Sequence, residues 1–151
     1  MVAKIITEDY FNGQKMSEIP YVNGEKHGLV TWWHENGQKS QEIPYVKGQQ
    51  HGLATWWHEN GKKRREIPYV NGQVHGLATW WHENGKKSQE IPYVNGQEHG
   101  LATVQHLCGS LLWIQKWHQG QWVWDIRFTS QEQIYEDAEV ELFFHETPEL
   151  I

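Results

Sequence analysis

The chain has 151 residues, of which 38% are hydrophobic, and its length predicts a single folded domain with no room for separate cofactor and substrate domains. Its formal net charge is −6 at pH 7; residues 130–151 hold seven acidic residues and no Lys or Arg, which leaves 13 basic and 12 acidic residues, or +1, in residues 1–129. A near-neutral body with an acidic end excludes a nucleic-acid binder, because such a protein carries a basic surface that neutralises many phosphates.

Residues 1–10 contain two adjacent isoleucines but no apolar stretch of signal-peptide length and no small-residue cleavage site. No segment has the long apolar run that a membrane-spanning helix requires. Cys108 is the only cysteine, so the chain forms no intramolecular disulfide and needs no oxidising compartment. We therefore expect a cytoplasmic protein without an integral membrane segment.

An internal repeat of 24 residues dominates the chain. The tetrapeptide Ile-Pro-Tyr-Val starts at Ile19, Ile43, Ile67 and Ile91. The tripeptide His-Gly-Leu starts at His27, His51, His75 and His99. A worn fifth copy continues to Gln121, and at the front Asn12-Gly13 matches Asn36-Gly37, which predicts that the array starts near Tyr10, halfway through a unit. We expect a repeat array in residues 1–121 and an acidic C-terminal cap in residues 122–151.

Each repeat is predicted to form one β-hairpin. In the third copy, Gly76–Glu83 and Lys86–Val94 are rich in aromatic and β-branched residues and are separated by Asn84-Gly85, the strongest short-range signal for a two-residue turn. A second turn at Asn95-Gly96 returns the chain to the next unit. The predicted fold is all-β: tandem hairpins that form an elongated, single-layer antiparallel sheet with a small C-terminal strand and helix as a cap.

A two-residue loop at Asn84-Gly85 would fix the pairing within the hairpin. It places Glu83 opposite Lys86 and Tyr93 opposite Gly76, where a Cβ would obstruct the tyrosine ring. Adjacent Trp80 and Trp81 then lie on opposite faces. Because 24 is even, this sidedness repeats in every unit, and each face carries a column of tryptophans.

The pattern Gly-x-x-x-Trp-Trp-x-Glu-Asn-Gly, followed by Ile-Pro-Tyr-x-x-Gly and His-Gly, resembles the MORN repeat variant. The resemblance covers residues 10–103 well and 104–121 weakly, and the proline of the second strand and the doubled tryptophan are departures in detail. It implies an elongated single-layer sheet, proteins that scaffold or bind other proteins and, in bacteria, the antitoxin of a toxin-antitoxin pair.

The C-terminal segment is predicted to close the array. Residues 121–128 alternate as a strand that completes the last hairpin. Ser130 and Gln133 have capping-box spacing, which predicts a short helix over residues 131–137, and residues 138–144 alternate as a further strand. Together they would cover an exposed sheet edge.

The ten histidines suggest metal binding, but their spacing argues against it. His34, His58 and His82 form one ladder, and neighbouring rungs are two strands, or roughly 9.6 Å, apart. A zinc site needs three or four ligands at about 2 Å, and the predicted pairing also sets Lys39, Lys63 and Lys87 opposite this ladder. We expect no metal and no cofactor, and histidines that bond turn backbone or face water.

Catalysis is not expected either. His106 and Cys108 are the only imidazole and thiol close in sequence, on one face if they lie in a strand, but no orienting group or oxyanion donor accompanies them. We expect Cys108 to be a small buried thiol, and the glutamates beside the turns to pair with the following strand. The sequence therefore predicts a protein that is not an enzyme.

The aromatic columns are the candidate binding surface: Trp32, Trp33, Trp56, Trp57, Trp80, Trp81, Tyr45, Tyr69 and Tyr93. They favour a non-enzymatic protein-binding module, with an antitoxin or immunity-like role as the resemblance implies, because Trp and Tyr are frequent interface anchors. A carbohydrate- or choline-binding cell-surface module that uses slots between tryptophans is one alternative. A structural scaffold or homodimer, with the rings engaged in packing, is the other.

Overall fold

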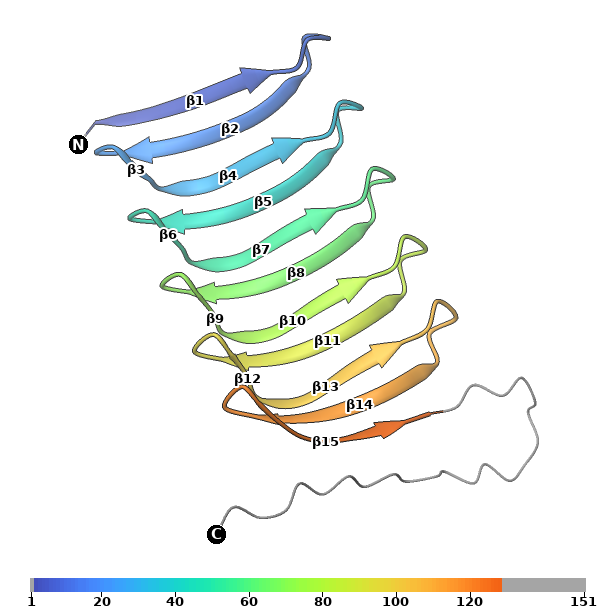
Figure 1. Ribbon diagram of the computed structural model, residues 1–151. Coiled ribbons are helices and arrows are strands. Elements are labelled where there is room, and N and C mark those ends of the chain that lie inside the picture. Colours follow the sequence, from blue (N-terminus) through green and yellow to red (C-terminus); the bar gives the residue numbers. More distant parts are fainter. Residues whose placement is uncertain (1, 129–151) are drawn as a thin grey trace.

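The computed structural model describes residues 2–128, which form one open antiparallel sheet of fifteen strands and contain no helix (Figure 1). Eleven strands lie side by side in chain order: β1 (Ala3–Asp9), β2 (Lys15–Val22), β4 (Gly28–Trp33), β5 (Lys39–Val46), β7 (Gly52–Trp57), β8 (Lys63–Val70), β10 (Gly76–Trp81), β11 (Lys87–Val94), β13 (Gly100–Gln105), β14 (Leu111–His118) and β15 (Gln121–Arg127). Four two-residue strands each pair with the end of the strand that precedes them in the chain: β3 (Glu25–Lys26), β6 (Gln49–Gln50), β9 (Gln73–Val74) and β12 (Gln97–Glu98). The predicted hairpin array and single-layer sheet are confirmed.

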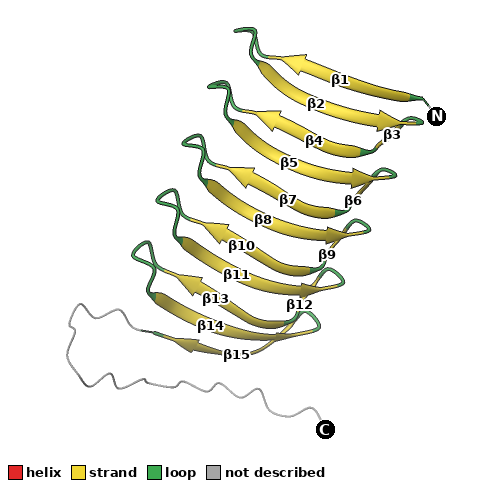
Figure 2. Cartoon of the chain, turned by 180° about the vertical axis from the view of Figure 1, so that it is seen from behind, coloured by secondary structure: helices red, strands yellow, loops and turns green. Residues whose placement is uncertain are grey.

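The strands are bowed along their length, and the turns stack above one another along both margins of the sheet (Figure 2). No helix among the described residues is long and apolar enough to cross a membrane. The predicted strand over residues 121–128 is present as β15, whereas the predicted helix at 131–137 and strand at 138–144 lie outside the described residues.

The array begins earlier than the sequence suggested. Strand β1 pairs with β2 along its whole length, with Ile6 opposite Ile19. Residues 4–9 stand 24 positions before residues 28–33, so β1 is the first strand of a complete unit. The prediction that the chain enters halfway through a unit was wrong, because Glu8 and Asp9 occupy the positions where later units have Trp-Trp.

The predicted pairing holds in the body of each hairpin but not at its tip. Gly76 is opposite Tyr93 as expected, and the ladder continues to Trp80 opposite Gln89. The register then shifts, so that Trp81 lies opposite Lys87. Glu83 therefore does not face Lys86.

The tip is a longer turn than a two-residue loop. The backbone N–H of His82 donates to Lys86 O (2.9 Å), and Gly85 N–H donates to His82 O (2.8 Å). Gly85 has a positive φ of +91° but Asn84 does not, whereas a type I′ turn needs both. Asn84 instead accepts the Lys86 N–H on Oδ1 (2.9 Å). The opposite turn does fit the prediction, since Asn95 and Gly96 have φ of +51° and +81°.

Successive hairpins are joined by a kink that the Pro and His-Gly motifs create. Pro92 has no N–H to donate, and its carbonyl accepts the His99 N–H at 2.9 Å. Gly100 follows with a φ of +113°, a region that residues with a side chain rarely adopt. The ladder between β11 and β13 is consequently short, with Gln89 opposite Val104 and Glu90 opposite Thr103.

The glycine of this kink is required for a different reason from the predicted one. A Cβ on Gly76 would lie 3.1 Å from Cγ of Pro68 in the preceding unit, and φ at Gly76 is +112°. Tyr93 is opposite Gly76 but is not among the nearest atoms that the Cβ would meet. The positive φ and the proline ring, not the tyrosine, exclude larger residues here.

The last unit lacks the kink. Lys116 and Trp124 replace the proline and glycine of the earlier units, and β15 pairs with β14 from Gln121 opposite His118 to Arg127 opposite Trp113. The restored N–H and the loss of the positive-φ glycine allow β15 to run as one strand, in which a one-residue register shift between Lys116 and Trp117 takes the place of the kink. The array thus ends in a hairpin of a different form.

The most buried residues form a row across the middle of the sheet, although no second layer of the described chain covers it. Small residues in the first strand of each unit are 0–2% exposed: Val30, Ala54, Ala78 and Ala102. The isoleucines opposite them are 7–9% exposed: Ile43, Ile67 and Ile91. Large residues thus pack beside small ones, as the sequence predicted.

Candidate binding faces

The sheet presents two chemically different faces, named here after two adjacent residues of β7. Trp56 lies opposite Gln41 on one neighbouring strand and Arg65 on the other, and these side chains share the Trp56 face. Trp57, the next residue in the strand, points to the Trp57 face. The predicted sidedness, with one tryptophan column on each face, is therefore present.

On the Trp56 face, the intervening strands fill the spaces between the tryptophans. The indole Nε1–H of Trp56 donates to Gln41 Oε1 at 2.6 Å, and the guanidinium carbon of Arg65 lies 4.1 Å from the centroid of the indole ring. Burial lowers the pKa of Arg65. Arg65 covers the Trp56 ring and Gln41 takes up its N–H, so this residue gives no support to a sugar-binding slot.

A second row on the Trp56 face alternates tyrosines with a position that differs in every unit. Lys26, Gln50, Val74 and Glu98 occupy that position. The Lys26 ammonium lies 5.2 Å from the ring centroid of Tyr45, and Tyr93 OH donates to Glu98 Oε1 at 3.2 Å. Burial, together with the charge of Glu98, raises the pKa of Tyr93 to about 12. The tyrosines are thus half-buried members of a mixed row.

The Trp57 face carries a repeated ion pair close to its tryptophans. The lysine at the start of each second strand pairs with the glutamate three residues later, as Lys87 does with Glu90 at 2.6 Å. Lys63 makes the same pair with Glu66, and its ammonium lies 5.7 Å from the ring centroid of Trp81. The expectation that these lysines face the histidine ladder was wrong, because the register shift beside Trp81 turns them to the Trp57 face.

Repeated half-exposed apolar residues also lie on the Trp57 face, and the predicted site did not include them. Half-exposed leucines follow each kink glycine: Leu29 (47%), Leu53 (51%), Leu77 (50%) and Leu101 (51%). Valines close the second strands with similar exposure: Val46 (43%), Val70 (44%) and Val94 (42%). The prolines of the second strands lie between the leucines and the valines, as Pro68 does opposite Leu53. We call the four leucines and three valines the Leu/Val stripe.

The histidines hold successive turns together. Nε2 of His34 lies 3.3 Å from the carbonyl oxygen of Trp57, and His58 and His82 make the same contact one unit further along. At the other margin, the backbone N–H of Asn71 donates to Nδ1 of His51 at 3.3 Å. These contacts confirm the predicted bonding to turn backbone. Among residues 2–128, no group of three or more His, Cys, Asp or Glu side chains is placed to hold a metal ion.

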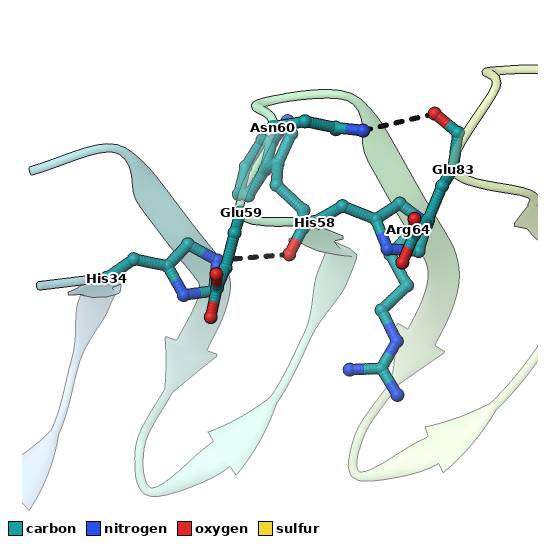
Figure 3. A pocket seen from close by; sticks show the side chains of 7 residues that line it. His34, His58, Glu59, Asn60, Arg64 and Glu83 are labelled. Carbon is teal, nitrogen blue, oxygen red and sulfur yellow. Dashed lines mark hydrogen bonds between the residues drawn. The ribbon is translucent and has the colours of Figure 1, made fainter. Parts of the chain in front are cut away.

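A hollow of about 390 Å³ opens where the turns meet, lined by His34, Trp57, His58, Glu59, Asn60, Arg64 and Glu83. Figure 3 shows His34 and Asn60 each bonding to the next turn, with Asn60 Nδ2 donating to Glu83 O at 3.1 Å. Arg64 extends away from these groups and replaces the serine of the neighbouring units. The polar lining is therefore largely used in joining the turns.

Cys108 is not the buried thiol that the sequence suggested. It lies exposed in the turn after β13, so it does not share a strand face with His106. Its Sγ is 3.0 Å from the hydroxyl of Ser110, and its backbone N–H donates to His106 Nδ1 at 3.3 Å. Hydrogen bonding from Ser110 lowers the pKa of the thiol to about 6.

Comparison with known proteins identifies the repeat. Residues 26–47, 50–71 and 74–95 each match the MORN repeat variant, as the sequence pattern suggested. Residues 26–95 are thus a module of a kind that generally binds or scaffolds and is typically non-catalytic. No curated protein matches the chain.

Proposed function

We propose, from the premise that residues 26–95 of this chain are MORN repeat variants, that the protein is a non-catalytic module that binds another protein across its Trp57 face. The observation that carries the proposal is the Leu/Val stripe. Its four leucines are each 47–51% exposed in a sheet whose other face has its central side chains buried. Exposed apolar residues in a continuous row are typical of protein interaction sites.

The surroundings of the stripe also support a protein partner. Trp33, Trp57 and Trp81 flank it as large rings of the kind that anchor interfaces. The lysines beside these rings already have glutamate partners within the chain, as Lys63 has Glu66. The stripe therefore carries little uncompensated charge, which favours an apolar partner surface with a polar rim over an anionic membrane.

Replacing Leu53 and Leu77 together by threonine tests the proposal. Threonine keeps the preference for strands but removes apolar area, so folding should change little while the affinity for the partner falls by about tenfold or more. The partner would be isolated by co-purification from the native cell, then purified and titrated calorimetrically against each variant.

The matched control replaces Gln50 and Val74 by threonine on the Trp56 face, where both are half-buried. This variant should bind the purified partner as the unmodified chain does. Equal losses of affinity in the two variants would contradict the use of the Trp57 face, and so would undiminished binding by the leucine variant.

The narrower role that the family resemblance implies is that of an antitoxin or immunity protein. A protein-binding sheet suits this role, because an antitoxin acts by covering its toxin. Co-expression provides the test. Expression of the partner should stop the growth of the host cell, co-expression of the unmodified chain should restore it, and co-expression of the Leu53→Thr, Leu77→Thr variant should not. A partner that is harmless when expressed alone would leave the module a scaffold.

A further inference from the structure

The outer edge of β1 is an uncovered sheet edge. Among residues 2–128, β1 pairs only with β2, and all seven of its residues are exposed. In later units the strand at the same position is covered by the preceding hairpin. Ile6 is 36% exposed, whereas its counterparts one to four units later are 0–2% exposed: Val30, Ala54, Ala78 and Ala102. Ile6 is thus a partly exposed isoleucine at a position whose side chain is buried in the next four units.

The backbone of β1 has hydrogen-bonding groups directed outward. The carbonyl oxygen of Val2 accepts the Asn23 N–H at 2.9 Å, so the backbone groups of Val2 point towards the β2 side of the strand. Along an antiparallel strand, successive residues direct their backbone N–H and C=O groups alternately towards one neighbouring strand and the other. Ile5 is opposite Pro20, which has no N–H to donate, as expected where the backbone groups of Ile5 point away from β2. The N–H and C=O groups of Ala3, Ile5 and Thr7 therefore face away from β2.

The side chains of β1 are complementary to a second copy of the same strand. Lys4 and Glu8 lie on one face, two residues before and two after Ile6. Neither forms a salt bridge with another residue of the described range, although Ser17 Oγ donates a long hydrogen bond to Glu8 at 3.4 Å. In an antiparallel pair centred on Ile6, Lys4 of each copy lies opposite Glu8 of the other.

We propose that β1 is a dimerisation edge, at which two copies of this chain pair antiparallel about a two-fold axis through Ile6 and join their sheets. Ile5 and Thr7 of opposite copies then exchange backbone hydrogen bonds through their outward groups. Ile6 with Ile6 and Lys4 with Glu8 become the non-hydrogen-bonded pairs, in which cross-strand side chains are closest. A symmetric contact uses the same edge of both copies, so the assembly closes at two. This inference is independent of the Trp57 face.

Charge exchange between two variants is the decisive experiment, with mass measured by sedimentation equilibrium or by light scattering on a sizing column. The full chain should have about twice the 17.9 kDa mass of one copy. Lys4→Glu alone and Glu8→Lys alone each set like charges opposite one another and should weaken dimerisation at least about tenfold. An equimolar mixture of the two variants pairs opposite charges at both positions and should recover the dimer.

A backbone variant tests the same edge without charge. Thr7→Pro removes an outward donor and leaves the bonds to β2 in place, a position at which an edge strand tolerates proline. It should be monomeric with unchanged circular dichroism, and Thr7→Val should remain dimeric. If Thr7→Pro misfolds, the equimolar mixture of the Lys4→Glu and Glu8→Lys variants still tests whether β1 is the dimerisation edge.

Three results would overturn the proposal. The first is a wild-type chain that is monomeric at all concentrations, and the second is an equimolar variant mixture that stays monomeric. The third is a monomeric wild-type chain in which the Thr7→Pro substitution makes residues 129–151 newly sensitive to protease, which would assign the edge to the chain's own C-terminal segment.

Discussion

Trp56 shows how single residues stabilise a sheet that has only one layer. Neighbouring strands lie about 4.8 Å apart, close enough for planar groups to stack on one another. The guanidinium of Arg65 lies over the Trp56 ring, 4.1 Å from its centroid, and the indole N–H at the ring edge donates to Gln41 Oε1 at 2.6 Å. Contacts with the neighbouring strands thus bury the Trp56 ring in part without a second layer.

At the same scale, Cys108 should react as a thiolate at lower pH than an ordinary cysteine. Hydrogen bonding from Ser110 favours the charged form, which lowers the thiol pKa to about 6, and the side chain is exposed. The rate of alkylation by iodoacetamide should rise with pH to a plateau with its midpoint near pH 6, because the thiolate is the nucleophile.

Ser110→Ala is the control for this prediction. Without the hydroxyl donor, the midpoint should move up towards the usual value for a free cysteine, about 8.5. A midpoint already above about 8 in the unmodified protein would show that Ser110 does not stabilise the thiolate.

At the scale of the elements, each kink between hairpins depends on glycine. Gly76→Val places a β-branched residue at a φ of +112° and brings its Cβ to 3.1 Å from the Pro68 ring. We expect the free energy of unfolding to fall by about 1–3 kcal/mol for the backbone strain and by a similar further amount for the crowding. Chemical denaturation followed by tryptophan fluorescence measures the loss.

Gly96→Val separates the two causes. Gly96 has a φ of +81°, but no atom lies within 4 Å of the position that a Cβ would take there, so this variant carries only the backbone strain. It should lose clearly less stability than Gly76→Val. Equal losses would mean that the contact with Pro68 contributes nothing.

The hairpins and their sidedness could be predicted because an even repeat and the Asn-Gly signals determine them. The form of each turn could not, because the same dipeptide folds in two ways. Asn95-Gly96 forms a tight turn, whereas Asn84 accepts a neighbouring N–H and donates from Nδ2 to Leu107 O of the next unit at 2.8 Å. The contact with the next hairpin, which local sequence does not reveal, selects the longer turn and hence the register shift.

The candidate site could be predicted only in part. The Trp and Tyr columns follow from the repeat, but the filling of the space beside Trp56 depends on which residue of the neighbouring strand meets it. The Leu/Val stripe was not predicted although the single-layer sheet was, because an aliphatic residue in a strand, such as Leu53, suggests a core position whereas Trp and Tyr suggest interface anchors. Strand β1 was missed because Glu8 and Asp9 interrupt the aromatic pattern.

At the scale of the whole molecule, the units should be removable one at a time. Within residues 2–128, the main contacts of each hairpin are with its neighbours, and they repeat every 24 residues, so deleting residues 50–73 brings equivalent surfaces together. The shortened chain should fold, with a denaturant m-value reduced in proportion to the residues removed. Circular dichroism and urea titration test this.

Deleting only residues 50–61 is the matched control. It would join β5 to β8, which run in the same direction, and parallel strands cannot be linked by a tight turn. This variant should aggregate or lose its β-sheet signal. Normal folding after the half-unit deletion, or failure of the whole-unit deletion, would contradict a modular array.

Because the hairpins lie side by side, the length of the sheet increases by a fixed step with each added unit. Every unit contributes two strands, or about 9.6 Å, along the direction in which the array grows, and the distinctive hairpin of β14 and β15 closes it whatever the number of units before it. Tandem duplication of a unit would therefore move the two ends apart by one fixed increment, as on a ruler with graduations of about 9.6 Å. Anything attached at the two ends would be held at a spacing that gene duplication could adjust step by step.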